Sequence, residues 1–81
     1  MSNTYNRRPI NVNFMKVRYK LGVSQDTFGK ALYISRHVTQ AYESGRCQPN
    51  LATIKELFKM ANIPKEELYD FIFDFNYVIP K

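Results

Sequence analysis

Residues that begin helices and residues that end them alternate along this sequence at short intervals. Gly22, Gly45 and Asn62 are typical helix terminators, because glycine and asparagine tolerate the left-handed backbone that closes a last turn. The expected helix starts lie at polar N-cap residues or at a proline: Asn13, Ser24, Ser35, Asn50 and Pro64. The chain is therefore restricted to a series of short helices joined by short loops.

Apolar side chains repeat at helical spacing between these start and stop signals. The second and third helices are expected at Gln25 to about Leu32 and at Arg36 to Glu43. The apolar positions of the other three predicted helices are Phe14, Val17, Leu21, Leu51, Ile54, Leu57, Phe58, Ala61, Leu68, Phe71, Ile72 and Phe75. An alternating strand pattern is present only weakly, at residues 77–79. We therefore expect an all-α protein of five helices.

The 81 residues are enough for one domain and too few for two. Residues 1–12 are polar, rich in asparagine and interrupted by Pro9, so they predict a flexible N-terminal arm. Residues 13–75 are expected to form the helical domain, and residues 76–81 a C-terminal tail. Aromatic residues make up 15% of the chain, which favours a packed core over disorder.

Positive charge is concentrated in the N-terminal half of the chain, which carries a net charge of +5 overall. Residues 1–48 contain eight Lys and Arg against two acidic residues, whereas residues 49–81 contain four against five. This asymmetry favours a polyanionic partner for the first half. A merely basic, solvated surface is equally compatible with the charge alone.

The composition argues against several classes of protein. Cys47 is the only cysteine, so a disulfide within the chain is excluded and a reducing compartment is expected. One histidine, one cysteine and scattered carboxylates provide no catalytic triad, metal-ligand spacing or phosphate-binding glycine loop, so we expect neither an enzyme nor a cofactor. No apolar run approaches the roughly 20 residues that span a bilayer, and the N-terminus lacks a secretory signal. An intracellular protein without membrane contact is expected.

Several short motifs in register resemble the Cro/XRE family of phage and bacterial repressors, whose domains have the lambda-repressor-like fold. The motifs are Ser-Gln at 24–25, Ile-Ser-Arg at 34–36, Tyr-Glu-Ser-Gly-Arg at 42–46 and Glu-Glu-Leu-Tyr at 66–69. The resemblance extends from Phe14 to Tyr69, about two thirds of the chain. It implies a compact five-helix domain with a helix-turn-helix. It also implies a transcriptional regulator, acting in the cytoplasm at the nucleoid as a dimeric repressor on double-stranded DNA.

The resemblance implies that the helix beginning at Arg36 is the recognition helix. Its first side chains would enter the major groove, so Arg36, His37 and Gln40 are candidates for reading bases and Ala41 for contacting a thymine methyl. Arginine suits guanine and glutamine suits adenine, because each side chain can bond two atoms of that base. His37 is equally compatible with an ordinary exposed residue.

Polar residues around this helix are expected to contact phosphates. By resemblance, Gln25 would direct its amide at a phosphate and brace Arg36, whereas a simple capping role is the alternative. The other candidates for phosphate contacts, some of which also suit helix caps, are Ser35, Ser44, Arg46 and Asn50.

Other positions match structural features of the family. Arg18 and Glu43 correspond to an ion pair between the first helix and the end of the recognition helix, and Gly29 to a close helix approach. Two residues depart from the pattern. Tyr33 replaces a turn glycine and is expected to need a positive φ or a reshaped turn. Thr39 replaces a buried Val or Ile and is expected to bond its hydroxyl to a preceding carbonyl.

The segment 68–79 contains more large apolar side chains than one helical face can bury. By resemblance, we expect the surplus to form a dimer contact, with these candidates: Phe71, Phe73, Phe75, Tyr77 and Val78. Two alternatives fit the same residues. The tail folds back over its own core, or the surface receives another protein, in which case the chain is an interaction module such as an antitoxin or antirepressor.

Overall fold

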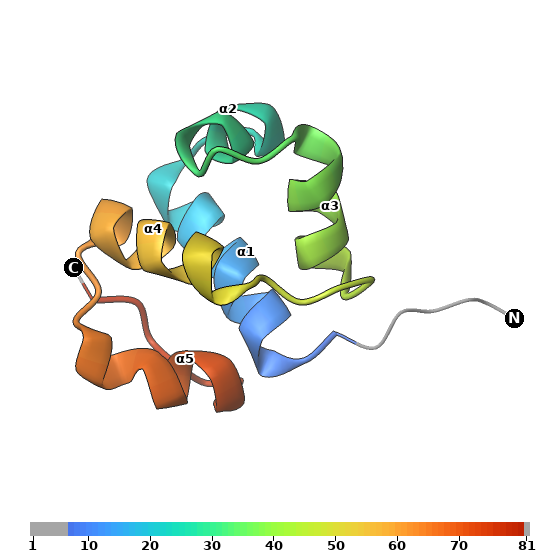
Figure 1. Cartoon of the computed structure of the whole chain (residues 1–81). Coiled ribbons are helices and arrows are strands. Elements are labelled where there is room, and N and C mark those ends of the chain that lie inside the picture. Colours follow the sequence, from blue (N-terminus) through green and yellow to red (C-terminus); the bar gives the residue numbers. More distant parts are fainter. Residues whose placement is uncertain (1–6, 81) are drawn as a thin grey trace, which may run out of the picture.

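The computed structural model describes residues 7–80 of the chain (Figure 1). Its helices are α1 (Pro9–Leu21), α2 (Gln25–Ala31), α3 (Arg36–Ser44), α4 (Leu51–Ala61), the short 3-10 helix η1 (Lys65–Glu67) and α5 (Leu68–Phe73). No strand occurs within residues 7–80, so the expected all-α class is confirmed. The weak strand pattern at residues 77–79 corresponds to irregular backbone.

Helix α1 lies at the centre, with α2 and α3 on one side and α5 on the other (Figure 1). The α1 residue Phe14 is fully buried, and its ring packs edge-on against two other rings. The ring centroids lie 5.2 Å from Phe28 of α2 and 5.5 Å from Tyr42 of α3. Since removing a buried phenylalanine ring costs about 3–5 kcal/mol, this cluster holds the first three helices together.

The predicted N-caps of three helices are confirmed. The side chains of Ser24, Ser35 and Asn50 accept hydrogen bonds from backbone N–H groups three residues later, over 3.1, 3.1 and 2.8 Å. Each such bond stabilises a helix start by about 1 kcal/mol. The predicted terminators are also confirmed, because all three have left-handed backbone angles: Gly22, Gly45 and Asn62.

Helix α1 begins five residues earlier than predicted, at Pro9 rather than at Phe14 after an Asn13 cap. The expectation of a flexible arm over residues 1–12 was therefore wrong for residues 9–12, where Ile10 is buried; residues 1–6 lie outside the described part. Proline suits the first position of a helix, where its missing N–H costs nothing. The Asn11 side chain accepts a hydrogen bond from the Arg8 backbone N–H (3.0 Å), which completes this start.

The two buried asparagines of α1 bond backbone carbonyls of distant segments. Asn11 Nδ2 donates to the carbonyls of Tyr42 (2.6 Å) and Cys47 (2.9 Å), at and beyond the end of α3. Asn13 Nδ2 donates to the carbonyl of Phe71 in α5 and to that of Asp74 just after α5, each at a distance of 2.8 Å. The amides therefore satisfy carbonyls that a helix end leaves without partners, and they fix both α3 and α5 on α1.

Part of the C-terminal segment folds back onto the core. Phe71 is fully buried, and its ring packs edge-on against those of Phe58 (5.2 Å) and Tyr77 (5.7 Å). Tyr77 and Ile79 are also buried. The prediction that Phe71 and Tyr77 form a dimer contact was therefore wrong, because both side chains are buried in the core of the same molecule. The other three candidates remain exposed: Phe73, Phe75 and Val78.

Three residues expected on apolar helix faces lie largely at the surface: Leu21, Leu51 and Phe75. Each stands at or beyond the end of a helix, where neighbouring elements cover it only in part. Leu21 is the last residue of α1, Leu51 is the first of α4, and Phe75 lies two residues after α5 ends. Helical spacing identifies the right face of a helix but does not show how far along that face the neighbouring helices reach.

Three positions singled out in the sequence lie in or beside the turn between α2 and α3: Gly29, Tyr33 and Thr39. A Cβ atom on Gly29 would lie 2.7 Å from Thr39 Oγ1 and 2.9 Å from the Ile34 carbonyl oxygen, so only glycine fits this helix approach. Thr39 is fully buried, and its hydroxyl donates to the Ser35 carbonyl (3.0 Å), as expected. Tyr33 has a φ of 62° and a side chain that is 83% exposed.

We predict that Tyr33→Gly raises the free energy of unfolding by about 1 kcal/mol, or about 4–8 °C in Tm, because glycine adopts a positive φ without steric cost. Urea and thermal unfolding measure the change. Tyr33→Ala is the matched control, since it removes the same exposed ring but keeps a Cβ atom. Equal stabilisation by both variants would contradict backbone strain as the cause.

Burial raises the pKa of Tyr77 well above its usual value, and the hydrogen bond from its hydroxyl to Glu67 acts in the same direction. The unfolded chain ionises this tyrosine near pH 10, so its contribution to stability is complete below about pH 10 and declines above it. We predict that unfolding free energy falls more steeply above about pH 10 in the wild type than in Tyr77→Phe, by up to about 1.4 kcal/mol per pH unit. Parallel urea titrations in alkaline buffers would refute this if the two slopes agree.

Candidate nucleic-acid interface

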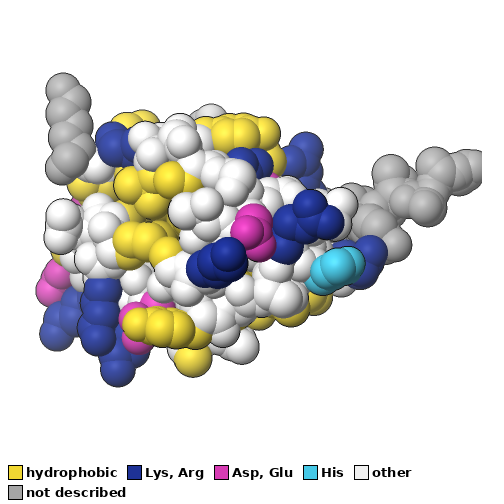
Figure 2. Space-filling view, turned by 90° about the horizontal axis from the view of Figure 1, so that it is seen from above, with side chains coloured by type: hydrophobic (Ala, Val, Ile, Leu, Met, Phe, Trp, Pro, Cys, Tyr) yellow, Lys and Arg dark blue, Asp and Glu magenta, His cyan; other side chains and the backbone are white. Residues whose placement is uncertain are grey.

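Three of the predicted base-reading side chains lie together on the outer face of α3. Arg36 and His37 are the first two residues of the helix, Gln40 follows one turn later, and all three are exposed. The opposite face carries Thr39 and Tyr42, which are buried against the rest of the domain. Figure 2 shows the molecule from above, with the histidine next to basic side chains at one end. The start of α3 thus presents hydrogen-bonding groups to solvent.

Glu43, the only carboxylate of α3, is withdrawn from this face. It is buried and forms a bidentate ion pair with Arg18 of α1, over 2.6 Å from Nε and 3.0 Å from Nη2. The hydrogen bond to Glu43 raises the pKa of Arg18 above its usual value, against the opposing effect of burial. Arg18 also donates to the carbonyl of Val23 (3.0 Å). The predicted pair is therefore confirmed, and the exposed face of α3 carries no negative charge.

Gln25 belongs to this same cluster. Its Nε2 donates to Glu43 Oε1 over 3.1 Å, and the side chain is half-buried. This bond engages the Gln25 amide nitrogen, whereas bracing of the Arg36 guanidinium would use the Gln25 amide oxygen, so that expectation stays a prediction. Gln25 links the start of α2 to the end of α3.

Ala41 is buried, so the prediction that it contacts a thymine methyl was wrong. Its position one residue after Gln40 turns it toward the domain rather than outward. The Ala41 carbonyl accepts from the Ser44 hydroxyl (3.2 Å) and from the Arg46 N–H (3.0 Å), and these bonds close the last turn. Ser44 is thus half-buried and its hydroxyl is used in a local hydrogen bond. The Arg46 side chain is exposed beyond the end of the helix.

Two further phosphate candidates, Ser35 and Asn50, are exposed residues that cap α3 and α4. The Ser35 oxygen accepts from the Val38 N–H and still has its own hydrogen to donate. Asn50 Oδ1 accepts from Thr53, which leaves its amide N–H groups directed elsewhere. Capping and phosphate binding therefore do not compete for the same atoms.

Sequence reasoning treated the C-terminal lysines only as part of a charge balance. In the structure three of them, Lys55, Lys59 and Lys65, line one apolar groove between α4 and the η1–α5 segment. The spacing of Lys55 and Lys59, one helical turn apart, was visible in the sequence. The position of Lys65 beside them depends on the bend at residues 62–64, which no local pattern reveals.

Comparisons with protein-family models, with curated proteins and with solved structures find no match to this chain. Within residues 7–80, no group of three or more His, Cys, Asp or Glu side chains is arranged to hold a metal ion. None of the helices in the described part is both long and apolar enough to cross a membrane.

We predict that Glu43→Ala lowers the free energy of unfolding by about 3 kcal/mol, because it leaves the largely buried guanidinium of Arg18 without its carboxylate partner. The double variant Arg18→Met, Glu43→Leu is expected to recover most of that loss, since it removes both charges. The control is Lys30→Ala, which breaks the exposed Lys30–Asp26 pair (3.4 Å) and should cost at most about 0.5 kcal/mol. Urea unfolding of the four proteins tests this. Equal losses in the single and double variants would mean that the charges play no part.

Proposed function

We propose that this protein binds double-stranded DNA in a sequence-specific manner, with the start of α3 in the major groove. The observation that carries the proposal is the exposure of Arg36, His37 and Gln40 on a helix face whose only carboxylate is neutralised inside the molecule. An outward carboxylate on α3 would repel phosphates, whereas the present arrangement leaves donors and one positive charge. The sequence resemblance to Cro/XRE repressors supports the same function.

Each side chain has a distinct task in this proposal. Arg36 bonds O6 and N7 of guanine, and Gln40 bonds N6 and N7 of adenine. His37 donates or accepts one hydrogen bond to a base edge or a phosphate. The backbone is held by the exposed polar groups that flank α3, which fix the register of the helix without reading sequence. These flanking groups are Ser35, Arg46 and Asn50, with the second amide hydrogen of Gln25.

The protein acts, in this proposal, as a dimeric repressor on a two-fold DNA site in the bacterial cytoplasm. Two copies of α3 about 34 Å apart would meet successive major grooves on one side of the duplex. The lambda-repressor-like arrangement implied by the resemblance belongs to this proposal as well. Because Phe71 and Tyr77 are buried, a dimer contact in the C-terminal segment would use the exposed side chains of Phe73, Phe75 and Val78.

The same exposed residues support a second candidate function, an interaction module whose main partner is another protein. Phe73, Phe75 and Val78 stay exposed although the tail around them packs on the core. The two functions differ in salt dependence. A DNA reader loses affinity with a log–log slope near −0.9 for each phosphate contacted, whereas a contact made by apolar side chains is nearly insensitive to salt.

We predict that Arg36→Ala weakens binding to the preferred DNA site by about 1–3 kcal/mol and relaxes the choice of base at one position. Preferred sites come from selection on random duplexes at moderate salt, and fluorescence anisotropy then measures affinity across a salt series. Lys30→Ala, on α2, is the control and should leave base choice unchanged. A uniform loss over all sequences would assign Arg36 to phosphate binding, and the absence of any enriched sequence would refute the proposal.

A further inference from the structure

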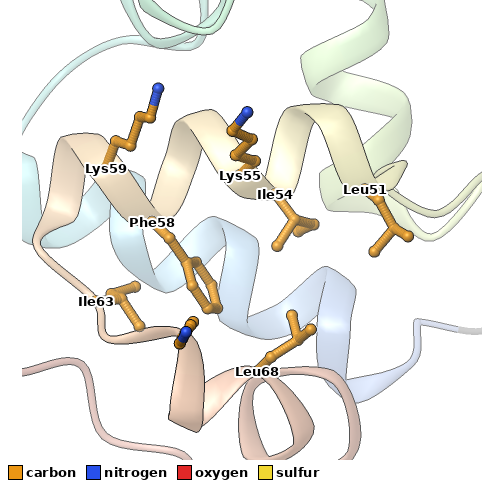
Figure 3. A pocket seen from close by; sticks show the side chains of 8 residues that line it. Leu51, Ile54, Lys55, Phe58, Lys59, Ile63 and Leu68 are labelled. Atoms are coloured by element: carbon orange, nitrogen blue, oxygen red, sulfur yellow. The ribbon is translucent and has the colours of Figure 1, made fainter.

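An apolar groove of about 340 Å³ lies between α4 and the segment formed by η1 and α5 (Figure 3). Its floor is formed by Ile54, Phe58 and Ile63, which also belong to the core. Leu51 and Leu68 stand at its open edge, and Leu51 is 71% exposed. Figure 3 shows Phe58, Ile63 and Leu68 converging on the space between the two helices. The groove is thus a continuous apolar surface with a well-packed base.

Three lysines form the rim of this groove. Lys55 and Lys59 project from the outer edge of α4 one turn apart, with their amino groups directed away from Phe58 (Figure 3). Lys65, in η1, lines the same groove. All three are exposed, and no carboxylate within residues 7–80 makes an ion pair with any of them. The nearby Glu67 instead accepts the hydroxyl of Tyr77. None of the three ammonium groups is therefore held in an ion pair within the described residues.

We infer that this groove binds an amphipathic helix from another protein, one that places apolar side chains over Phe58 and acidic side chains against the three lysines. Apolar floors with charged rims are how grooves receive amphipathic helices, which supply two or three anchoring side chains spaced by one turn. A volume of about 340 Å³ suits anchors of that number. The partner is expected to carry acidic side chains because the rim is positively charged, and like charges across an interface oppose binding.

A second copy of this chain fits the groove less well. In a two-fold dimer the same surface of both copies meets across the axis. Contact through the groove would then bring Lys55, Lys59 and Lys65 of one copy against the same lysines of the other. A small anionic amphiphile is also disfavoured, because the groove is open to solvent and would leave much of the molecule in water. The site is separate from α3, which lies on the other side of α1 (Figure 1).

The test uses the whole protein labelled with ¹⁵N and two synthetic helical peptides of about four turns. Both peptides carry leucines at i, i+3, i+4 and i+7; the remaining positions are alanine and glutamate in one, alanine and lysine in the other. We expect the glutamate peptide to shift the amide signals of α4 and of residues 63–68, and to bind at least about tenfold more tightly than the lysine peptide. No DNA is present, so failure of the DNA-binding proposal does not affect the result.

Variants at exposed positions complete the design. The triple variant Lys55→Glu, Lys59→Glu, Lys65→Glu should reverse the preference between the peptides while keeping the wild-type unfolding transition. Leu51→Ser should weaken the glutamate peptide several-fold, and Val78→Ser, on the exposed tail, should not. Several outcomes would overturn the inference. These are equal binding of both peptides, shifts centred on Phe73 and Val78, concentration-dependent shifts over the groove without peptide, and tighter binding of decanoate than of the glutamate peptide.

Discussion

The contact between Arg18 and Glu43 joins three of the helices, and the character of the α3 surface depends on it. Glu43 also accepts a hydrogen bond from Gln25 of α2, and Arg18 also donates to the carbonyl of Val23. The first three helices therefore meet around one buried carboxylate. A buried pair of this kind contributes little net stability, but it fixes the direction in which its helices point. The same contact hides the one negative group of α3 from an approaching polyanion. The same two side chains therefore affect both the orientation of α1 and α3 and the charge on the surface of α3.

Local chemistry was enough to predict the middle of the fold. Ser24, Ser35 and Asn50 cap helices because a short polar side chain reaches its own backbone, and this interaction needs no information from elsewhere in the chain. Asn13 shows where such reasoning fails. An asparagine before an apolar run is read as a cap, yet its amide bonds carbonyls 58 and 61 residues away. Buried polar residues give no periodic signal in the sequence, so α1 was predicted to start five residues too late.

The candidate site also has a part that the sequence predicted correctly and a part that it did not. The exposed positions of α3 follow from helical geometry once its first residue is known, and Arg36, His37 and Gln40 were identified correctly as surface residues. The position of Ala41 could not be judged from spacing, because one residue along a helix turns a side chain by about 100° and the packing partners decide which angles are covered. The hydrogen bond between Gln25 and Glu43 depends on how α2 packs against α3. Local sequence patterns do not reveal this tertiary contact.

The Asn13 amide has a consequence for how the chain folds. It connects the first helix to the last turn of α5, so the ordering entropy of a loop of about 60 residues must be lost before this bond forms. Contacts of such high sequence separation slow the search for the native state in an otherwise local, helical topology. Because the first and last helices are joined through backbone carbonyls, neither end can fray without freeing the other. Opening is therefore expected to be a single cooperative event rather than a gradual peeling of the C-terminal helix.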